Sequence, residues 1–254
     1  MEDTYSRFSS VVEHYLRYRP RYPHQLAEWL KAECDLSPTQ VVADIGSGTG
    51  LLAELFLQHG NQVYGVEPNG EMRAAAAYLL RSYPLFTSIA ATAEATTLAK
   101  HSVHLIVVGQ AFQWFTLEPT RQEFLRILIP SGWVMLVWNL QRNTGSPFAA
   151  AFEQFWHTYI DPRTPFRREG KRPDFIAEFF CAAHVKETGL ANSQVCDFDA
   201  LKGRVLSASR APQADDQRYP AMLDELTTIF RHYQEGGTVT LAYDTRIVCG
   251  QLSA

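Results

Sequence analysis

A glycine-rich turn within residues 41–56 constrains the fold of this chain more than any other feature. The segment reads VVADIGSGTGLLAELF: a short apolar run, an acid, three glycines at alternate positions, and then a helical pattern. A buried strand that leads through glycines into a helix is typical of ligand-binding α/β proteins, because the helix N-terminus offers unpaired N–H groups. We therefore predict that this turn binds a ligand.

Strands and helices alternate through the rest of the first half. The apolar run VHLIVVGQ is continuous rather than alternating, which indicates a strand covered on both faces of a parallel sheet. A βαβ rhythm of this kind predicts a doubly wound, mostly parallel α/β sheet. The predicted strands are 41–45, 62–68, 86–92, 103–110 and 133–139, with helices at 11–18, 24–33, 50–60, 70–83 and 120–128.

The second half is aromatic-rich and more helical. Helices are predicted at 146–160, 199–210 and 221–234, and two further strands at 193–198 and 236–250 complete a seven-stranded sheet. No linker splits this tail from the rest, so we predict a single domain over residues 1–254. Its expected parts are an N-terminal helical lid (1–37), a core (38–140), a helical, substrate-side elaboration (141–237) and a closing strand (238–254).

Composition and charge exclude several classes of protein. The formal net charge of −4 argues against a general nucleic-acid binder, which needs a basic surface excess. The N-terminus lacks the pattern of a secretory signal, and no apolar run approaches the roughly 20 residues that span a bilayer. The four cysteines lie far apart, so no metal site is expected. We predict a cytoplasmic protein, monomeric or homodimeric, without nucleic-acid or membrane partners.

Two acids indicate which ligand the glycine turn accepts. The third glycine of a dinucleotide fingerprint would fall at position 51, where the chain has Leu51. Asp44 at the strand tip would repel a pyrophosphate but would attract an ammonium group. Glu67, at the end of the next strand, is placed to hold ribose hydroxyls. A ligand with an amino-acid tail and an adenosine but no phosphate, such as S-adenosylmethionine, satisfies these features.

The segments VVADIGSGTG, VYGVEPNGEM, ATAEATTL and IVVGQAFQWF resemble, in order, the motifs of class I S-adenosylmethionine-dependent methyltransferases of the type 11 kind. The flanking segments YLRYRPRYP and LKGRVLSASRAP resemble a subgroup of trans-aconitate methyltransferase-like enzymes. The resemblance implies a Rossmann-like fold, S-adenosylmethionine as cofactor and S-adenosylhomocysteine as product. It also implies a set of cofactor-binding residues: Asp44, Gly46, Ser47, Gly48, Glu67, Pro68, Asn69, Met72, Ala93, Glu94 and Gln110, with Tyr15, Arg19 and Tyr22 closing from the lid.

The loop GQAFQWFT, after the fourth strand, is expected to face the methyl acceptor, since open α/β sheets place ligands at the carboxyl ends of their strands. Many relatives carry His-Trp where this chain has Gln113 and Trp114, and a glutamine cannot act as a base near neutral pH. Gln113, Trp114 and Asn139 are the candidate catalytic residues, the acceptor being a small molecule with a carboxylate or hydroxyl. A non-catalytic cofactor-binding protein and a nicotinamide-dependent oxidoreductase are the alternatives.

Overall fold

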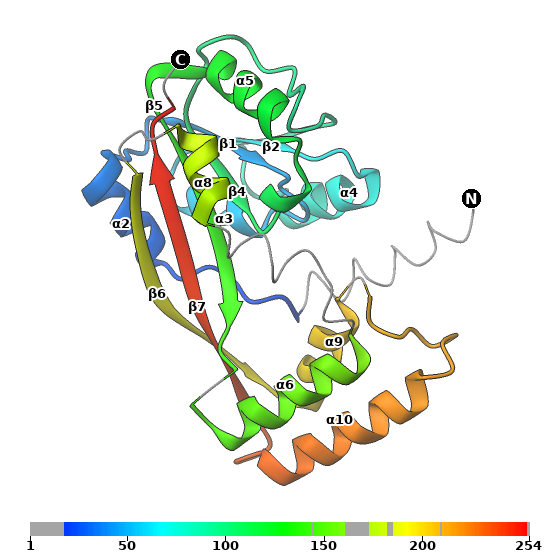
Figure 1. Cartoon of the computed structure of the whole chain (residues 1–254). Coiled ribbons are helices and arrows are strands. Elements are labelled where there is room, and N and C mark those ends of the chain that lie inside the picture. The colour runs from blue at the N-terminus through cyan, green and yellow to red at the C-terminus, as the bar shows by residue number, and fades with distance from the viewer. Residues whose placement is uncertain (1–17, 144, 161–172, 182–184, 209, 253–254) are drawn as a thin grey trace. The chain divides into compact units, whose positions relative to one another are not determined.

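The computed structural model describes residues 18–143, 145–160, 173–181, 185–208 and 210–252 (Figure 1). The chain divides into two compact units, each assembled from discontinuous segments. Unit 1 comprises Met1–Pro20, Leu140–Arg167 and Ala191–Asp244, and unit 2 comprises Arg21–Asn139, Arg168–Leu190 and Thr245–Ala254. The prediction that residues 1–254 act as one domain stays a prediction.

Unit 2 contains the alternating part of the chain. Asn69 begins helix α4 by accepting the Met72 backbone N–H (3.0 Å), as an N-terminal cap does. The elements that lie in it are α2 (Gln25–Cys34), β1 (Val41–Ile45), α3 (Leu51–Gln58), β2 (Gln62–Val66), α4 (Gly70–Leu79), β3 (Phe86–Ile89), β4 (Val103–Gly109), the 3-10 turn η1 (Phe112–Trp114), α5 (Leu117–Ile127) and α8 (Pro173–Phe180).

Three longer strands, β5 (Leu128–Gln141), β6 (Val185–Cys196) and β7 (Val239–Gly250), have residues in both units. With the other four they form a seven-stranded sheet in the order β3-β2-β1-β4-β5-β7-β6. The pairs from β3 to β5 are all parallel, and β7 runs opposite to β5 (Figure 1). The predicted doubly wound, mostly parallel α/β fold with seven strands is confirmed.

Some element boundaries differ from the predicted ones. Strand β5 begins at Leu128, ahead of the predicted residue 133, because the chain continues through Pro130 with a register shift opposite Val103 and Leu105. Strand β6 begins at Val185, eight residues before the predicted start. Its residues alternate between exposed and half-buried, so this polar edge strand carries too weak an apolar pattern to be recognised in the sequence.

The core of unit 2 explains why the first strands form where they do. The apolar faces of β1, β4 and α3 supply fully buried side chains such as Val42, Val107 and Phe56. Leu26 and Leu30 of α2 belong to the same cluster and are themselves fully buried. Helix α2 is therefore part of this core, and the lid role proposed for residues 1–37 stays a prediction.

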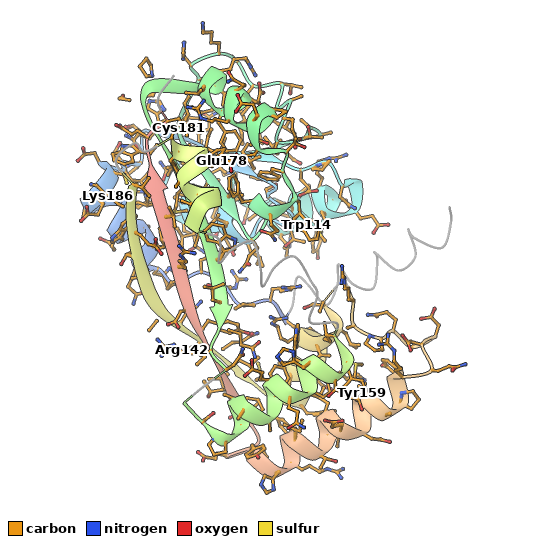
Figure 2. The ribbon with its side chains drawn as sticks, in the orientation of Figure 1. Trp114, Arg142, Tyr159, Glu178, Cys181 and Lys186 are labelled. Atoms are coloured by element: carbon orange, nitrogen blue, oxygen red, sulfur yellow. The ribbon has the colours of Figure 1, made fainter. Side chains whose placement is uncertain are left out.

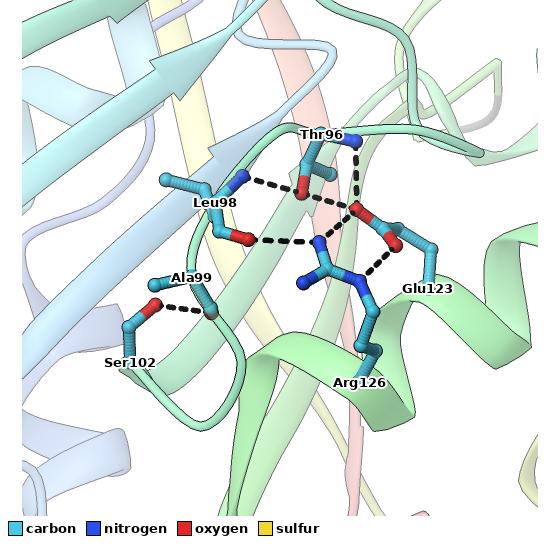
Figure 3. Close-up of polar contacts among 6 residues, drawn as sticks. All are labelled: Thr96, Leu98, Ala99, Ser102, Glu123 and Arg126. Carbon is cyan, nitrogen blue, oxygen red and sulfur yellow. Dashed lines mark hydrogen bonds and ion pairs between the residues drawn. The ribbon is translucent and has the colours of Figure 1, made fainter.

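A buried carboxylate ties helix α5 to the loop that precedes β4 (Figure 3). Glu123 Oε1 accepts hydrogen bonds from the Thr96 backbone N–H (2.7 Å) and hydroxyl (2.5 Å). Arg126 donates to both Glu123 oxygens and also to the Leu98 carbonyl. Burial opposes ionisation of Glu123, but these hydrogen bonds lower its pKa below the usual value. The network is satisfied by the protein alone.

The described residues of unit 1 include the helices α6 (Pro147–Tyr159), α9 (Phe198–Leu206) and α10 (Tyr219–Tyr233), together with the ends of β5, β6 and β7. Helices α6 and α10 lie side by side (Figure 1). On α6, Phe152 stacks on both Phe148 and Phe155, with ring centroids 5.6 and 5.7 Å away. Within the described ranges, none of the helices combines the length and the apolarity needed to cross a membrane.

Candidate functional site

The turn between β1 and α3 is closely packed against the loop that follows β4. Gly46 has a φ of +70°, and a Cβ atom built on it would lie 2.6 Å from the Ala111 Cβ. Any side chain at position 46 would therefore clash as well as strain the backbone. The backbone N–H groups of Gly46 and Ser47 both donate to the Val66 carbonyl (2.8 and 3.1 Å). These contacts hold the turn at the carboxyl ends of β1, β2 and β4.

Glu67, just after β2, bonds to the same turn. Its Oε2 accepts the Gly48 backbone N–H (3.0 Å) and its Oε1 accepts the Asn69 backbone N–H (2.9 Å). A carboxylate has about four lone-pair positions, so both oxygens can accept further bonds. The half-buried Glu67 is thus oriented but not saturated, which fits a carboxylate that holds two hydroxyls. Next to it Pro68 is exposed, and the side chain of Met72, in the first turn of α4, is half-buried.

Asp44, at the end of β1, is 1% exposed. Among the described residues, neither of its carboxylate oxygens has a hydrogen-bond partner. Burial raises the pKa of Asp44 to about 8, helped by the charge of Glu67 and opposed by the nearby Ala53 backbone N–H, whose geometry falls short of a hydrogen bond. At neutral pH Asp44 is therefore mostly protonated until a cation approaches it. The predicted repulsion of a pyrophosphate is correspondingly weaker than a full negative charge would give.

The loop after β4 presents two more unsatisfied oxygens. Gln110 has a φ of +62°, and its backbone N–H donates to the Val137 carbonyl. Gln113 Nε2 donates to the Gln110 carbonyl (2.7 Å), and this bond fixes which end of the amide is the oxygen. The side-chain Oε1 atoms of Gln110 and Gln113 are buried, and no described residue bonds to either.

Thr49 is a site residue that sequence reasoning did not single out. It lies in the glycine turn and is 1% exposed, and its hydroxyl has no partner among the described residues. The available signal was a hydroxyl between two turn glycines. With Asp44, Gln110 and Gln113 it forms a group of buried polar atoms around the ends of β1 and β4, in which the two amide oxygens only accept and Asp44 accepts through both oxygens once it is ionised. Such a group calls for a ligand that brings hydrogen-bond donors, such as an ammonium group or hydroxyls.

Two predicted cofactor residues lie in the loop that follows β3. Ala93 is buried, and Glu94 accepts the Thr116 backbone N–H (2.9 Å) at the start of α5. Burial opposes ionisation of Glu94, but the hydrogen bonds from Thr116 and Thr92 lower its pKa. Glu94 therefore has a structural role at the start of that helix, and its contact with the cofactor stays a prediction.

The three candidate catalytic residues differ in their surroundings. Gln113 is half-buried with an unpaired oxygen. Trp114 is 66% exposed on the turn after β4 (Figure 2). Asn139 is 6% exposed, and its Oδ1 accepts the Thr245 hydroxyl (2.6 Å), so this side chain is held within the sheet. Phe112, on the same turn as Gln113 and Trp114, is buried against Phe179 and is a core residue.

The predicted lid residues fall in different parts of the chain. The Tyr22 ring lies against Gly109 at the end of β4, where a Cβ atom on the glycine would be 2.5 Å from the tyrosine hydroxyl. Arg19 belongs to unit 1, where its Nη2 donates to the Ser207 carbonyl (2.8 Å). Tyr15 lies outside the described residues. Tyr22 is thus at the strand edge that holds the predicted cofactor residues.

The fold and this site define a class of protein. A doubly wound sheet, a glycine turn after its first strand, an acid after its second strand and unpaired acceptors at the same edge are typical of a nucleoside-cofactor-binding α/β protein. The unpaired acceptors favour a ligand rich in donors over a pyrophosphate, which offers acceptors only.

Comparison with known proteins gives the family. Residues 43–136 match the family model described as "Methyltransferase domain". An uncharacterized methyltransferase of Schizosaccharomyces pombe is 30% identical over 253 residues, which cover 95% of this chain and 97% of the relative. An uncharacterized methyltransferase of Mycobacterium tuberculosis is 35% identical over 134 residues, about half of each chain. The chain belongs to the class I S-adenosylmethionine-dependent methyltransferases.

Solved structures agree with this fold. A proposed type II methyltransferase from Anaeromyxobacter dehalogenans superposes with a TM-score of 0.66 at 22% identity, over 93% of this chain and all of that one. A proposed methyltransferase of an antibiotic biosynthesis pathway from Anabaena variabilis gives 0.62 at 20% identity, over 93% and 99%. At such identities the likeness establishes the fold alone. The trans-aconitate methyltransferase-like subgroup stays a prediction.

Proposed function

We propose that this methyltransferase transfers the methyl group of S-adenosylmethionine to a small-molecule acceptor that carries a carboxylate or a hydroxyl. The observation that supports the proposal best is the group of buried, unpaired acceptors at the ends of β1 and β4. The resemblance to trans-aconitate methyltransferase-like enzymes, carried by YLRYRPRYP and LKGRVLSASRAP, makes organic acids the first acceptors to test.

The residues present fit the cofactor. Asp44 would accept from its ammonium group, and that positive charge would return the buried carboxyl to its ionised form. Glu67 would hold the two ribose hydroxyls with its remaining lone pairs, while Gly48 and Asn69 keep it oriented. Gly46 and Ser47 would border the methionine portion, where the packed turn leaves no room for a side chain at position 46.

When bound, S-adenosylmethionine would supply an activated methyl group on its sulfonium, with the sulfur as the leaving group that would keep the electron pair of the carbon–sulfur bond. The task of the chain is then to align the acceptor and to exclude water. Gln113 Oε1 is fixed by the bond from its own amide to Gln110, so it can accept a hydrogen bond from an acceptor hydroxyl. It cannot remove a proton near neutral pH. A carboxylate acceptor has none to lose, whereas a hydroxyl acceptor would have to release its proton to solvent as it is methylated.

The test combines binding with product detection. The purified chain is incubated with S-adenosylmethionine and a panel of organic acids, phenols and amines, and S-adenosylhomocysteine is measured together with the mass of each acceptor. A gain of one methyl group on a single chemical class is the expected result. A folded protein that binds NAD but not S-adenosylmethionine would overturn the cofactor assignment. Cofactor binding without transfer to any acceptor class would instead support the non-catalytic alternative.

A further inference from the structure

Helix α9 carries an arginine into the interior of unit 1. Arg204 is 7% exposed. Its Nε donates to the Tyr243 hydroxyl (3.3 Å), and its guanidinium carbon lies 5.3 Å from the centroid of the Trp156 ring. These two contacts come from β7 and from α6, so two other elements of unit 1 contact the guanidinium group that α9 carries.

No carboxylate balances this charge among the described residues. Arg204 Nη1 is buried without a hydrogen-bond partner, and no ion pair reaches the side chain. Four acids of unit 1 bond to other groups: Asp197 caps α9, Glu153 accepts from Asn143, Glu225 accepts from Tyr159, and Asp244 pairs with Arg142. In the described part of this unit, no carboxylate is hydrogen-bonded to Arg204.

The groups nearest to Arg204 are neutral. Tyr243 is fully buried, and its hydroxyl also reaches Gln194 Oε1 (3.5 Å). Burial raises the pKa of the Cys196 thiol to about 11, so this neighbour is not an anion at physiological pH. An arginine remains charged even when it is buried, and a buried charge without a counter-ion is costly. The Trp156 face and one hydroxyl offset only part of that cost.

The residues around Arg204 are closely packed and hydrogen-bonded to one another. The preceding residue, Gly203, lies against the Tyr18 ring, where a Cβ atom would come within 1.9 Å of a ring carbon. The Tyr18 carbonyl accepts Gln194 Nε2 (2.9 Å), and Gln194 in turn meets the Tyr243 hydroxyl. These contacts hold the elements that carry the guanidinium and its neighbours.

We infer that unit 1 holds a carboxylate-binding site at Arg204. A planar guanidinium with unpaired N–H groups matches a carboxylate in a bidentate way. The aromatic neighbours Trp156 and Tyr243 suit the apolar part of an organic acid better than a strongly hydrated inorganic ion. The site uses residues of unit 1 only, so the inference does not rest on the proposed function.

Binding of succinate and of benzoate to the full chain, measured by calorimetry without cofactor, tests the site. Arg204→Met, which keeps an unbranched apolar stem but removes the guanidinium group, is expected to weaken binding at least about tenfold. The matched control is Arg218→Met, because Arg218 is an exposed arginine of the same unit that pairs with Asp216. The control is expected to bind as the unchanged chain does. Equal binding by a folded Arg204→Met variant, or no binding of either acid to the unchanged chain, would overturn the inference.

Thermal unfolding separates a binding role from a structural one. A methionine at this position removes an uncompensated buried charge, so Arg204→Met without ligand is expected to unfold at the same temperature or higher. Succinate should then raise the melting temperature of the unchanged chain and of Arg218→Met, but not of Arg204→Met. A lower melting temperature for Arg204→Met, with an unchanged response to succinate, would indicate a purely structural arginine.

A final arm identifies the source of the carboxylate. With S-adenosylmethionine present, the mass of the recovered succinate or benzoate is measured. A methylated acid that the unchanged chain forms but Arg204→Met does not would mean that the site binds the methyl acceptor, whereas an unmodified acid that still binds through Arg204 would mean a separate, free ligand. Both results support the site. Because binding is measured without cofactor, failure of methyl transfer is distinguishable from failure of the Arg204 site.

Discussion

Two buried carboxylates of unit 2, one at the tip of β1 and one on α5, have opposite surroundings. Glu123 on α5 accepts from Thr96 and Arg126, and these bonds hold its pKa below the usual value (Figure 3). Asp44 has no bonded partner among the described residues, and burial raises its pKa to about 8. The difference shows that the chain can satisfy a buried acid, yet leaves one unsatisfied where the glycine turn meets the sheet.

The largest expected effect comes from Glu123, the buried carboxylate that Thr96 and Arg126 hydrogen-bond. Glu123→Ala removes the acceptor of two buried Thr96 donors and the partner of Arg126, so the free energy of unfolding should fall by about 3 kcal/mol. Cofactor affinity should stay within about twofold. Chemical denaturation and calorimetry measure the two quantities, with the exposed Glu118→Ala on the same helix as control. A loss of cofactor affinity as large as the loss of stability would remove the distinction between the two acids.

The unpaired carboxyl of Asp44 should make the stability of the chain depend on pH. The Asp44 pKa is about 8 in the folded chain against 3.8 ordinarily, so between these values the unfolded chain has released a proton that the folded chain retains. Stability should therefore fall as the pH rises from 6 to 8, and Asp44→Asn should flatten that fall by about 2 kcal/mol. Glu123 acts in the opposite sense, because its contribution is lost as the pH falls through its lowered folded-state pKa.

Denaturant midpoints of the unchanged chain and of Asp44→Asn, measured at several pH values, test the predicted pH dependence of stability. Identical pH profiles for Asp44→Asn and the unchanged chain would show that the carboxyl is not buried as described. Cofactor binding below pH 8 should also release a proton in the unchanged chain but not in Asp44→Asn, which calorimetry in buffers of different ionisation enthalpy detects.

Glu67 lies between these extremes, since its two oxygens are bonded but not saturated. Glu67→Ala removes the charge-assisted bonds expected to the ribose and should weaken cofactor binding by about 1.5 kcal/mol. Fluorescence or calorimetric titration with S-adenosylhomocysteine measures the change, with the exposed Glu28→Ala as control. An unchanged dissociation constant would place Glu67 outside the site.

The smallest effect is expected from an unpaired oxygen that carries no charge. Gln113→Ala should lower turnover about tenfold while the cofactor dissociation constant changes by less than about twofold. Gln122→Ala, an exposed glutamine on α5, is the matched control. Loss of cofactor binding in a folded Gln113→Ala variant would assign this oxygen to the cofactor instead of the acceptor.

The sequence predicts the parts of this molecule that depend on local spacing. The glycine turn, the acid after β2 and the parallel strand rhythm were all recognisable, because each follows from residues close together in the chain. The burial of Asp44 could not be recognised in the sequence, since it comes from elements that are distant along the chain. The predicted role of Trp114 likewise ignored its exposure, and the unpaired Arg204 is visible only once three elements of unit 1 have assembled.

The discontinuous make-up of the two units has a consequence for protein engineering. The segment that matches the methyltransferase model, residues 43–136, lies wholly within unit 2. The helices α6, α9 and α10 of unit 1 come from later parts of the chain, and strands β5, β6 and β7 connect these parts to unit 2. Expression of either unit as one uninterrupted gene fragment would sever shared strands. Chimeras between relatives should therefore join at the unit boundaries within those strands, exchanging 1–20, 140–167 and 191–244 together and retaining 43–136 intact.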